Sequence, residues 1–346
     1  MHPTRDETAD KCVHVSTEGD RGISPVEILD VRYPPPFEMP VYARRRRPLW
    51  PALVLFLLTV ISTLSVGSEF ARSYAENREP FSDNQDLLAL MALPYRHPAT
   101  LMLGIPFSFT LMAILLAHEL GHYFAGKFYG IDVSYPYFIP APNLFGTFGA
   151  FIRIRSPITT RRALFDVGLS GPVVGFLVAL PAMAYGVATS KVVPGAESNA
   201  AIVFGHPLLV RFFAAAFYPH ADVTWVLLNP VARAAWVGLF VTALNLLPVW
   251  QLDGGHVMFS LVTKWHRAVS IGVSLGLLLM GWLTTRGTGD WMSVWYLWGG
   301  LLLILTLRFR HPPVYDPWQP LDGTRRAWAV VALVIFSLCF TPWPAT

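Results

Sequence analysis

The sequence contains little charge and almost no cysteine. Asp, Glu, Lys and Arg make up 14% of its 346 residues, whereas a soluble domain usually carries about 25%. Its two cysteines, Cys12 and Cys339, lie at opposite ends of the chain, which excludes a disulfide framework and a thiolate metal site. This balance also excludes a disordered chain, an ordinary soluble enzyme and a basic nucleic-acid-binding module, so we expect no nucleic-acid partner.

Apolar residues take the place of charged ones. They make up 53% of the chain and gather in about seven segments close to the ~20 residues that a helix needs to cross a bilayer. A shorter apolar segment, 204–217, is interrupted by His206, Pro207 and Arg211 and is expected to lie in the interface or to re-enter the membrane. The sequence therefore predicts an all-α polytopic membrane protein. The predicted spans are 49–67, 100–126, 164–188, 231–247, 268–285, 291–307 and 327–340.

The N-terminal segment sets the expected orientation. Residues 1–48 are polar, contain no apolar core of a signal peptide, and end in the arginine run 44–47 directly before the first span. Basic residues stay on the cytoplasmic side of a membrane, so we predict a flexible cytoplasmic tail. When the spans are threaded from this start, most of the 26 Lys and Arg residues fall on the same side.

The second apolar segment contains the motif His118-Glu119-Leu120-Gly121-His122. On a helix, His118 and His122 project from one face, so both imidazoles can reach a single zinc ion at about 2.0–2.1 Å. Glu119 is rotated about a quarter-turn away, near enough to contact a water on the metal as a general base. The alternative is a pair of histidines that hydrogen-bond to another helix, but within an apolar span three titratable groups carry a large desolvation cost.

A catalytic zinc site takes three protein ligands and a water, and Asp253 is the best candidate for the third ligand. Pro248 ends the fourth apolar segment, and Asp253 begins the next one. Non-helical backbone at membrane depth is tolerated only where protein or water surrounds it. Asp253 could instead only cap the following helix. In the threaded topology His118 and Asp253 fall at similar depth, which favours one zinc site per chain.

These residues resemble the site-2 protease family of intramembrane zinc metalloproteases, and look most like its bacterial and plastid-type branch. The segments 118–122 and 245–256 carry the resemblance, and 146–150 and 170–175 add to it. It implies zinc held by His118, His122 and Asp253, Glu119 as catalytic acid and base, and a supporting or oxyanion-contacting role for Asn245. About forty residues separate the third and fourth spans, too few for the PDZ domain that some members insert.

The expected organisation follows from the spans and the resemblance. A flexible tail (1–48), a first transmembrane helix (49–67) and an external loop (68–99) precede a metalloprotease core (100–264) and C-terminal transmembrane helices (265–346). We expect a multi-pass protein of the bacterial cytoplasmic membrane, with its N-terminus inside and the lipid bilayer around it. The oligomeric state is not encoded in any pattern of the sequence.

Two short extended stretches, 135–140 and 149–155, follow the second span, with turn-forming residues between them. They predict a β-hairpin that dips into the membrane. A peptide bond inside a helix is shielded, so a substrate must unwind before it is cut. The edge at Phe151 and Ile152 could pair with the unwound segment, or the hairpin could only shield the metal from lipid.

Other polar and small residues receive structural interpretations. Asp166 lies near Arg161 and Arg162 and is predicted to cap a helix or to form an ion pair. His256 could contact a ligand residue or simply be solvated at the interface. Gly171, Gly175 and Ala179 form a small-residue face, which indicates close packing of the third span against the second.

The sequence thus predicts an intramembrane zinc endopeptidase that hydrolyses peptide bonds in or next to the transmembrane helices of substrate proteins. A membrane metal-ion transporter that uses the same His and Glu helix is the alternative. A transporter would need metal-binding side chains on further spans, and the last three spans offer almost none. A proteolytically silent scaffold is disfavoured by the intact motif.

Overall fold

A computed structural model describes residues 48–81, 98–195, 204–286, 293–314, 316 and 320–343. The predicted flexible tail, 1–48, lies outside these residues except for Pro48. Much of the predicted external loop 68–99 and the first two residues of the predicted span 291–307 also lie outside them.

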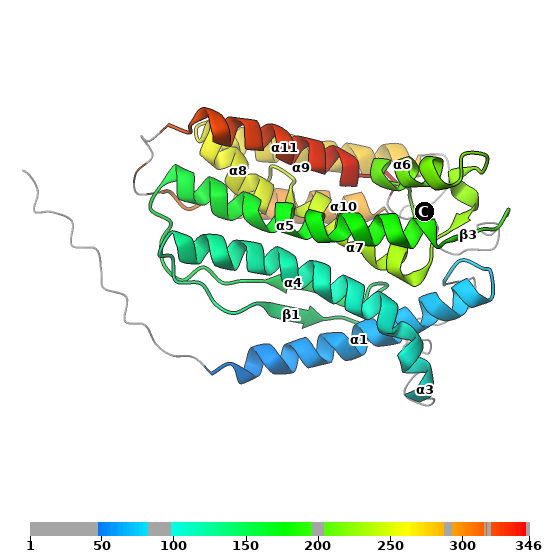
Figure 1. Ribbon diagram of the computed structural model, residues 1–346. Coiled ribbons are helices and arrows are strands. Elements are labelled where there is room, and N and C mark those ends of the chain that lie inside the picture. The colour runs from blue at the N-terminus through cyan, green and yellow to red at the C-terminus, as the bar shows by residue number, and fades with distance from the viewer. Residues whose placement is uncertain are drawn as a thin grey trace, which may run out of the picture. The chain divides into compact units, whose positions relative to one another are not determined.

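The described residues are mostly helical, as predicted, and the helices follow one another in an up-and-down order (Figure 1). Short β-strands make up two small sheets, and two 3₁₀ turns, η1 (Met102–Gly104) and η3 (Val223–Trp225), join neighbouring elements. The helices are α1 (Trp50–Ala75), α3 (Pro98–Leu101), α4 (Ile105–Phe128), α5 (Arg161–Ala188), α6 (Leu208–Phe217), α7 (Pro230–Asn245), α8 (Asp253–Val262), α9 (His266–Thr285), α10 (Val294–Arg308) and α11 (Gly323–Cys339).

Four stretches of helix among the described residues are long and apolar enough to cross a membrane: α1, the run Pro98–Phe128 that ends in α4, α5 and α9. The helices at the other three predicted spans, α7, α10 and α11, are shorter than these four. They contain 16, 15 and 17 residues. Proline or a polar capping residue stands where each of these helices begins, and this limits their length. Helix length and composition therefore support four membrane spans among the described residues, and the predicted count of seven is not confirmed.

Helix α5 is the central element of the bundle. It packs against α4 on one side and against α6, α7, α8 and α11 on others (Figure 1). Thr160 stands at the N-cap of α5. Its side chain accepts a hydrogen bond from the Ala163 N–H and so caps the first turn of the helix. Since α4 and α8 both contact α5, the two sequence motifs predicted to share a metal are brought to one helix.

The strands β1 (Tyr137–Pro140) and β2 (Thr147–Phe151) form an antiparallel pair between α4 and α5 in the chain. Tyr137 is opposite Phe151 and Phe138 is opposite Ala150. The turn between them contains Gly146, which has φ of +77° and lies against the backbone of α1. A second small sheet, β3 (Lys191–Val192) with β4 (Val226–Leu227), was not predicted.

Asp166 forms an ion pair, but not with the predicted partners. Its carboxylate accepts from Arg325 Nη2 at 2.5 Å and from the hydroxyl of Tyr129. Arg161 instead donates to the backbone carbonyl of Ser260 at 2.8 Å. The predicted ion-pair role is therefore confirmed. Its partner could not be named from the sequence, because Arg325 is far away along the chain and the docking of α11 against α5 brings it near.

Candidate metal centre

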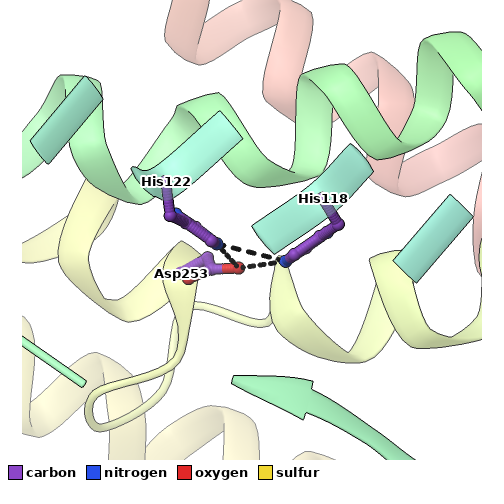
Figure 2. Close-up of side chains that lie close together, drawn as sticks. All are labelled: His118, His122 and Asp253. Atoms are coloured by element: carbon purple, nitrogen blue, oxygen red, sulfur yellow. Dashed lines mark hydrogen bonds and ion pairs between the residues drawn. The ribbon is translucent and has the colours of Figure 1, made fainter. Parts of the chain in front are cut away.

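Helix α4 presents the two histidines of the motif on one face. His118 and His122 are both buried, with 4% and 7% of their surface exposed, and their rings converge on the same point beside Asp253 in Figure 2. They lie one helical turn apart, which is the spacing that lets two side chains on a helix meet. The first half of the predicted site is therefore set by the helix alone.

Asp253 reaches these rings from the first turn of α8. Leu252, rather than Asp253, occupies the N-cap position of α8, and the Asp253 carboxylate is turned toward the histidines of α4 (Figure 2). The preceding loop folds tightly, because a Cβ on Gly254 would lie 2.0 Å from the carbonyl oxygen of Leu246. Trp250 adopts a φ of +51° in the same loop. The Gly residue after Asp253 thus permits the close turn that aims its carboxylate.

Three potential ligand atoms converge in the centre of the site. Asp253 Oδ2 lies 3.2 Å from His118 Nε2 and 3.3 Å from His122 Nε2, and the two Nε2 atoms are 3.1 Å apart (Figure 2). In a tetrahedral site with ligands about 2.0–2.1 Å from zinc, neighbouring ligand atoms are about 3.3 Å apart. These side chains therefore fit the edges of a zinc tetrahedron.

The protonation pattern also favours a metal. His122 Nδ1 lies 2.7 Å from the carbonyl oxygen of Val167, an acceptor that requires the proton to be on Nδ1. In the neutral ring Nε2 then carries a lone pair, and it faces the carboxylate oxygen of Asp253. Two electron-rich atoms at this distance need a proton or a metal cation between them, and a divalent metal would satisfy all three ligand atoms at once.

Glu119 lies in the same cavity, which has a volume of about 210 Å³. It is buried, and its carboxylate lies near the backbone N–H of Ile152. Asn245, at the end of α7, places Nδ2 3.3 Å from His118 Nε2. The cavity is also lined by Phe151 and Ile152, so the structure gathers every predicted site residue around one space.

Some parts of the site carried no signal in the sequence. The carbonyl of Val167 is a backbone atom, and nothing in its residue type marks it. Gln251 also lines the cavity, and only its place two residues before Asp253 could have drawn attention to it. His256 lines the cavity too. Its Nδ1 atom lies 2.8 Å from His311 Nε2, so its hydrogen-bond partner is not one of the three candidate metal ligands.

The small-residue face of α5 is fitted to the two histidines, as the sequence predicted. A Cβ on Gly171 would lie 2.1 Å from His122 Nε2, and one on Gly175 would lie 3.1 Å from the Cβ of His118. Ala179, on the same face, is fully buried. Side chains at these positions would occupy the space of the imidazoles, so the absence of a side chain on α5 is part of the site.

We expect Gly171→Ala to weaken zinc binding by about 100-fold, a loss typical of disturbing the support of a metal ligand. The added methyl group would collide with the ligand atom of His122. Gly276→Ala on α9 is the matched control, because nothing lies within 4 Å of its Cβ. Competition with a zinc chelator measures both affinities, and unchanged zinc affinity in Gly171→Ala would contradict the proposed arrangement.

Two histidines on a helix joined by a distant carboxylate define a metal-binding enzyme core rather than a purely structural bundle. The chain belongs to Peptidase family M50, whose sequence model matches residues 106–282. This matched region begins in α4 and extends into α9, and it contains all the residues of the site. The family membership confirms the resemblance to the site-2 proteases that the motifs indicated.

The similar proteins described here are named as probable zinc metalloproteases. The chain is 30% identical over 303 residues to "Probable zinc metalloprotease EGY1, chloroplastic" of Arabidopsis thaliana. The aligned region covers 84% of this chain and 52% of that protein. It is 28% identical over 315 residues to the protein of the same name from Oryza sativa subsp. japonica, covering 84% and 50%. It is 31% identical over 247 residues to "Probable zinc metalloprotease EGY2, chloroplastic" of Arabidopsis thaliana, covering 70% and 42%.

The chain spans about half the length of these relatives. Their names place them in chloroplasts, which does not fit the predicted bacterial cytoplasmic membrane. The sequence motifs could not decide this point, because membrane helices and metal ligands have the same composition in both settings.

Proposed function

We propose that the protein is an intramembrane zinc metalloprotease that hydrolyses peptide bonds in or next to the transmembrane helices of other proteins. The observation that carries the proposal is the group of His118, His122 and Asp253 atoms, spaced as the edges of a zinc tetrahedron, beside the buried Glu119. The membership in Peptidase family M50 and the names of the relatives support it. We assign the core of the activity to residues 100–264.

Each side chain of the site has a separate role in the proposed hydrolysis. Zinc, when bound, acts as a Lewis acid on the scissile carbonyl and lowers the pKa of water toward about 7. Glu119 accepts the proton of the attacking water and passes it to the leaving amine. The Ile152 N–H lies near the Glu119 carboxylate. The Asn245 amide, close to His118, can donate a hydrogen bond to a developing oxyanion.

We propose that the site lies within the membrane, toward the side on which the N-terminal tail begins. His118 and His122 belong to the later half of α4, and α4 is part of the apolar run Pro98–Phe128. The multi-pass topology includes α7, α10 and α11 as shorter spans, and the substrates are transmembrane proteins of the same bilayer. Hydrolysis needs water in the cavity around the metal site, and we propose that water enters from that side.

We also propose that the β1–β2 hairpin enters the membrane and guides the substrate. Gly146 in its turn lies against Ser62 and Thr63, near the middle of α1, and Ser62 Oγ donates to the Gly146 carbonyl at 2.6 Å. The turn is therefore at the depth of the middle of a membrane-length helix. Phe151 and Ile152 form the part of the edge nearest the metal, where an unwound substrate segment can pair with the strand.

The hairpin edge can be tested with Ala150, which lines the metal cavity. Since the Ile152 N–H lies near the Glu119 carboxylate, a proline at 152 would disturb the surroundings of the general base as well as the edge. Backbone groups alternate along a strand, so Ala150 presents its N–H on the same edge as Ile152. In a Glu119→Gln background, Ala150→Pro is expected to reduce the capture of uncleaved substrate at least about fivefold.

Ala150→Val is the matched control for this experiment, because it enlarges the side chain and keeps the N–H. Co-purification of intact substrate with each variant measures the effect. Equal capture by the two variants would reject pairing at the edge and leave the hairpin as a shield for the metal.

The transporter alternative gains no support from the structure. Within the described ranges, the one group of three or more His, Cys, Asp and Glu side chains that could hold a metal ion is His118, His122 and Asp253. A permeation path requires several such groups in succession through the membrane. A single site at one depth suits catalysis.

The proposed function is tested with the purified full-length protein and a single-span test substrate in lipid vesicles. We expect one zinc ion per chain, cleavage of the substrate near or within its membrane segment, loss of cleavage with a chelator and recovery when zinc is added back. Metal flux in place of cleavage would support the transporter. Protein that neither binds zinc nor cleaves would overturn the proposal.

A further inference from the structure

A second cavity, of about 350 Å³, lies where α8, α9 and the end of α10 meet, and it is separate from the metal site. Its lining is strongly basic. Lys264, Arg267 and Arg310 line it together with two histidines, His266 and His311. Among the described residues that line it, none is acidic. A cavity with several cations and no carboxylate favours an anionic ligand.

Buried polar atoms without partners gather around the same cavity. The described part of the chain has four buried side-chain polar atoms without a hydrogen-bond partner, and three of them, Trp250 Nε1, His266 Nε2 and Thr306 Oγ1, belong to residues that line this cavity. His266 and Thr306 are only 5% and 3% exposed. Unpaired buried polar groups are costly and uncommon in native proteins, so their concentration at one place needs an explanation.

These atoms suit an oxyanion. The indole Nε1–H of Trp250 can only donate, the hydroxyl of Thr306 can donate, and the His266 ring donates from Nε2 when it is protonated. The other side of the His266 ring contacts the backbone of Trp250 and Gly255, which holds the ring in position. A ligand with several acceptor oxygens would satisfy donors that the protein leaves without a partner.

The surroundings of the cavity indicate where the ligand comes from. Trp265 and Phe309 are large and exposed, at 69% and 50%, and the Arg308 guanidinium lies 5.3 Å from the ring centre of Phe309. His266 is the first residue of α9, a helix long and apolar enough to cross a membrane. Exposed aromatic and basic residues at the end of a span are typical of the level of the lipid headgroups.

We propose that this cavity is a binding site for a phosphate oxyanion, supplied by the headgroup of an anionic phospholipid. Arg267 and Arg310 can pair with phosphate oxygens through their planar guanidinium groups, and Lys264 adds a point charge. Trp250 and Thr306 supply neutral donors at the base of the site.

The site adjoins the segment that carries Asp253. Trp250 belongs to the loop that leads into α8, and Asp253 begins that helix. His311 lines the basic cavity and His256 lines the metal cavity. The His311 Nε2 atom lies 2.8 Å from His256 Nδ1. A phosphate bound to Trp250 and its neighbours therefore orders the loop that aims the carboxylate of Asp253.

The test uses full-length protein in neutral detergent. Thermal unfolding is measured while phosphatidylglycerol or phosphatidylcholine is added in mixed micelles, and separately while inorganic phosphate replaces chloride at constant ionic strength. We expect phosphatidylglycerol, but not phosphatidylcholine, to raise the Tm. In Lys264→Gln/Arg310→Gln, the concentration that gives half of the shift should rise at least about tenfold, because charge-assisted contacts are lost.

Arg326→Gln is the matched control, because Arg326 is an exposed cation near the start of α11 that does not line the cavity. A Tm shift with inorganic phosphate as large as that with phosphatidylglycerol supports the oxyanion site and identifies its source as a soluble phosphate. Equal shifts in the double variant and in Arg326→Gln, or no shift with any phosphate in the unaltered protein, overturn the proposal.

Thr306→Val tests the buried donors independently of the surface cations. Valine has the shape of threonine without the hydroxyl, so removing an unpartnered buried polar atom should raise the Tm of the lipid-free protein. The same change should reduce the Tm shift produced by phosphatidylglycerol. A purely structural role for Thr306 would not give these opposite effects, and an undiminished lipid shift would count against the site.

Discussion

Replacing Glu119 with glutamine is expected to reduce cleavage by about 10³-fold while leaving one zinc ion bound per chain. Glutamine keeps the size and the hydrogen-bond acceptor of the side chain but cannot take a proton from water, and general acid and base groups contribute about 10²–10⁴-fold to rate. The Glu119 carboxylate lies near the Ile152 N–H, and the amide oxygen of glutamine can take the place of the carboxylate oxygen there. Cleavage of the single-span substrate and zinc content are measured on the same preparation.

Glu76→Gln is the control for this variant. Glu76 is exposed and caps the end of α1, where it pairs with Arg78, and we expect its replacement to leave cleavage and zinc content unchanged. Loss of zinc from Glu119→Gln would make Glu119 a ligand rather than a proton acceptor. Cleavage at the normal rate would remove it from the mechanism altogether.

Asp253→Asn is expected to weaken zinc binding by about 10³-fold and to abolish cleavage as a result. The Asp253 carboxylate is the anionic member of the ligand group, and breaking a buried charge pair costs about 4 kcal/mol, which corresponds to this factor. Asparagine is nearly isosteric, so the change tests charge and ligand strength more than packing. Zinc affinity is measured by competition with a chelator of known strength.

A second carboxylate outside the site provides the comparison for Asp253. Asp222 is exposed and caps the 3₁₀ turn η3, because its carboxylate accepts a hydrogen bond from the Thr224 N–H. We expect Asp222→Asn to retain zinc and cleavage, with at most a small loss of stability from the weaker cap. If Asp253→Asn retained zinc with undiminished affinity, the metal would need another third ligand.

Much of the site could be predicted from sequence because its parts are local. The spacing of His118 and His122 places them on one face of any helix, and a polar residue such as Asp253 after a broken apolar segment is conspicuous. The glycines of α5 were also predictable, because small residues at helical spacing permit close approach. The distances that bring these parts together required the structure.

Other features depended on contacts between distant segments. The predicted ion-pair role of Asp166 is confirmed, but its partner Arg325 is brought near by the docking of α11 and does not lie close to it in the sequence. The basic cavity draws Trp250, His266 and Thr306 from a loop and two helices, and none of these residues stands out in its own segment. The lengths of α7, α10 and α11 differ from the predicted spans because hydropathy does not show where a helix is capped.

The choice of donors at the metal site has a chemical consequence. Its candidate ligand atoms are imidazole nitrogens and a carboxylate oxygen, and no sulfur takes part. Thiolate ligands can be lost to disulfides or to sulfenic and sulfinic acids when a compartment becomes oxidising. Imidazole and carboxylate donors cannot form a disulfide or a sulfenic acid. The centre is therefore not open to thiol oxidation, the route by which a mild oxidant releases zinc from a cysteine-based site.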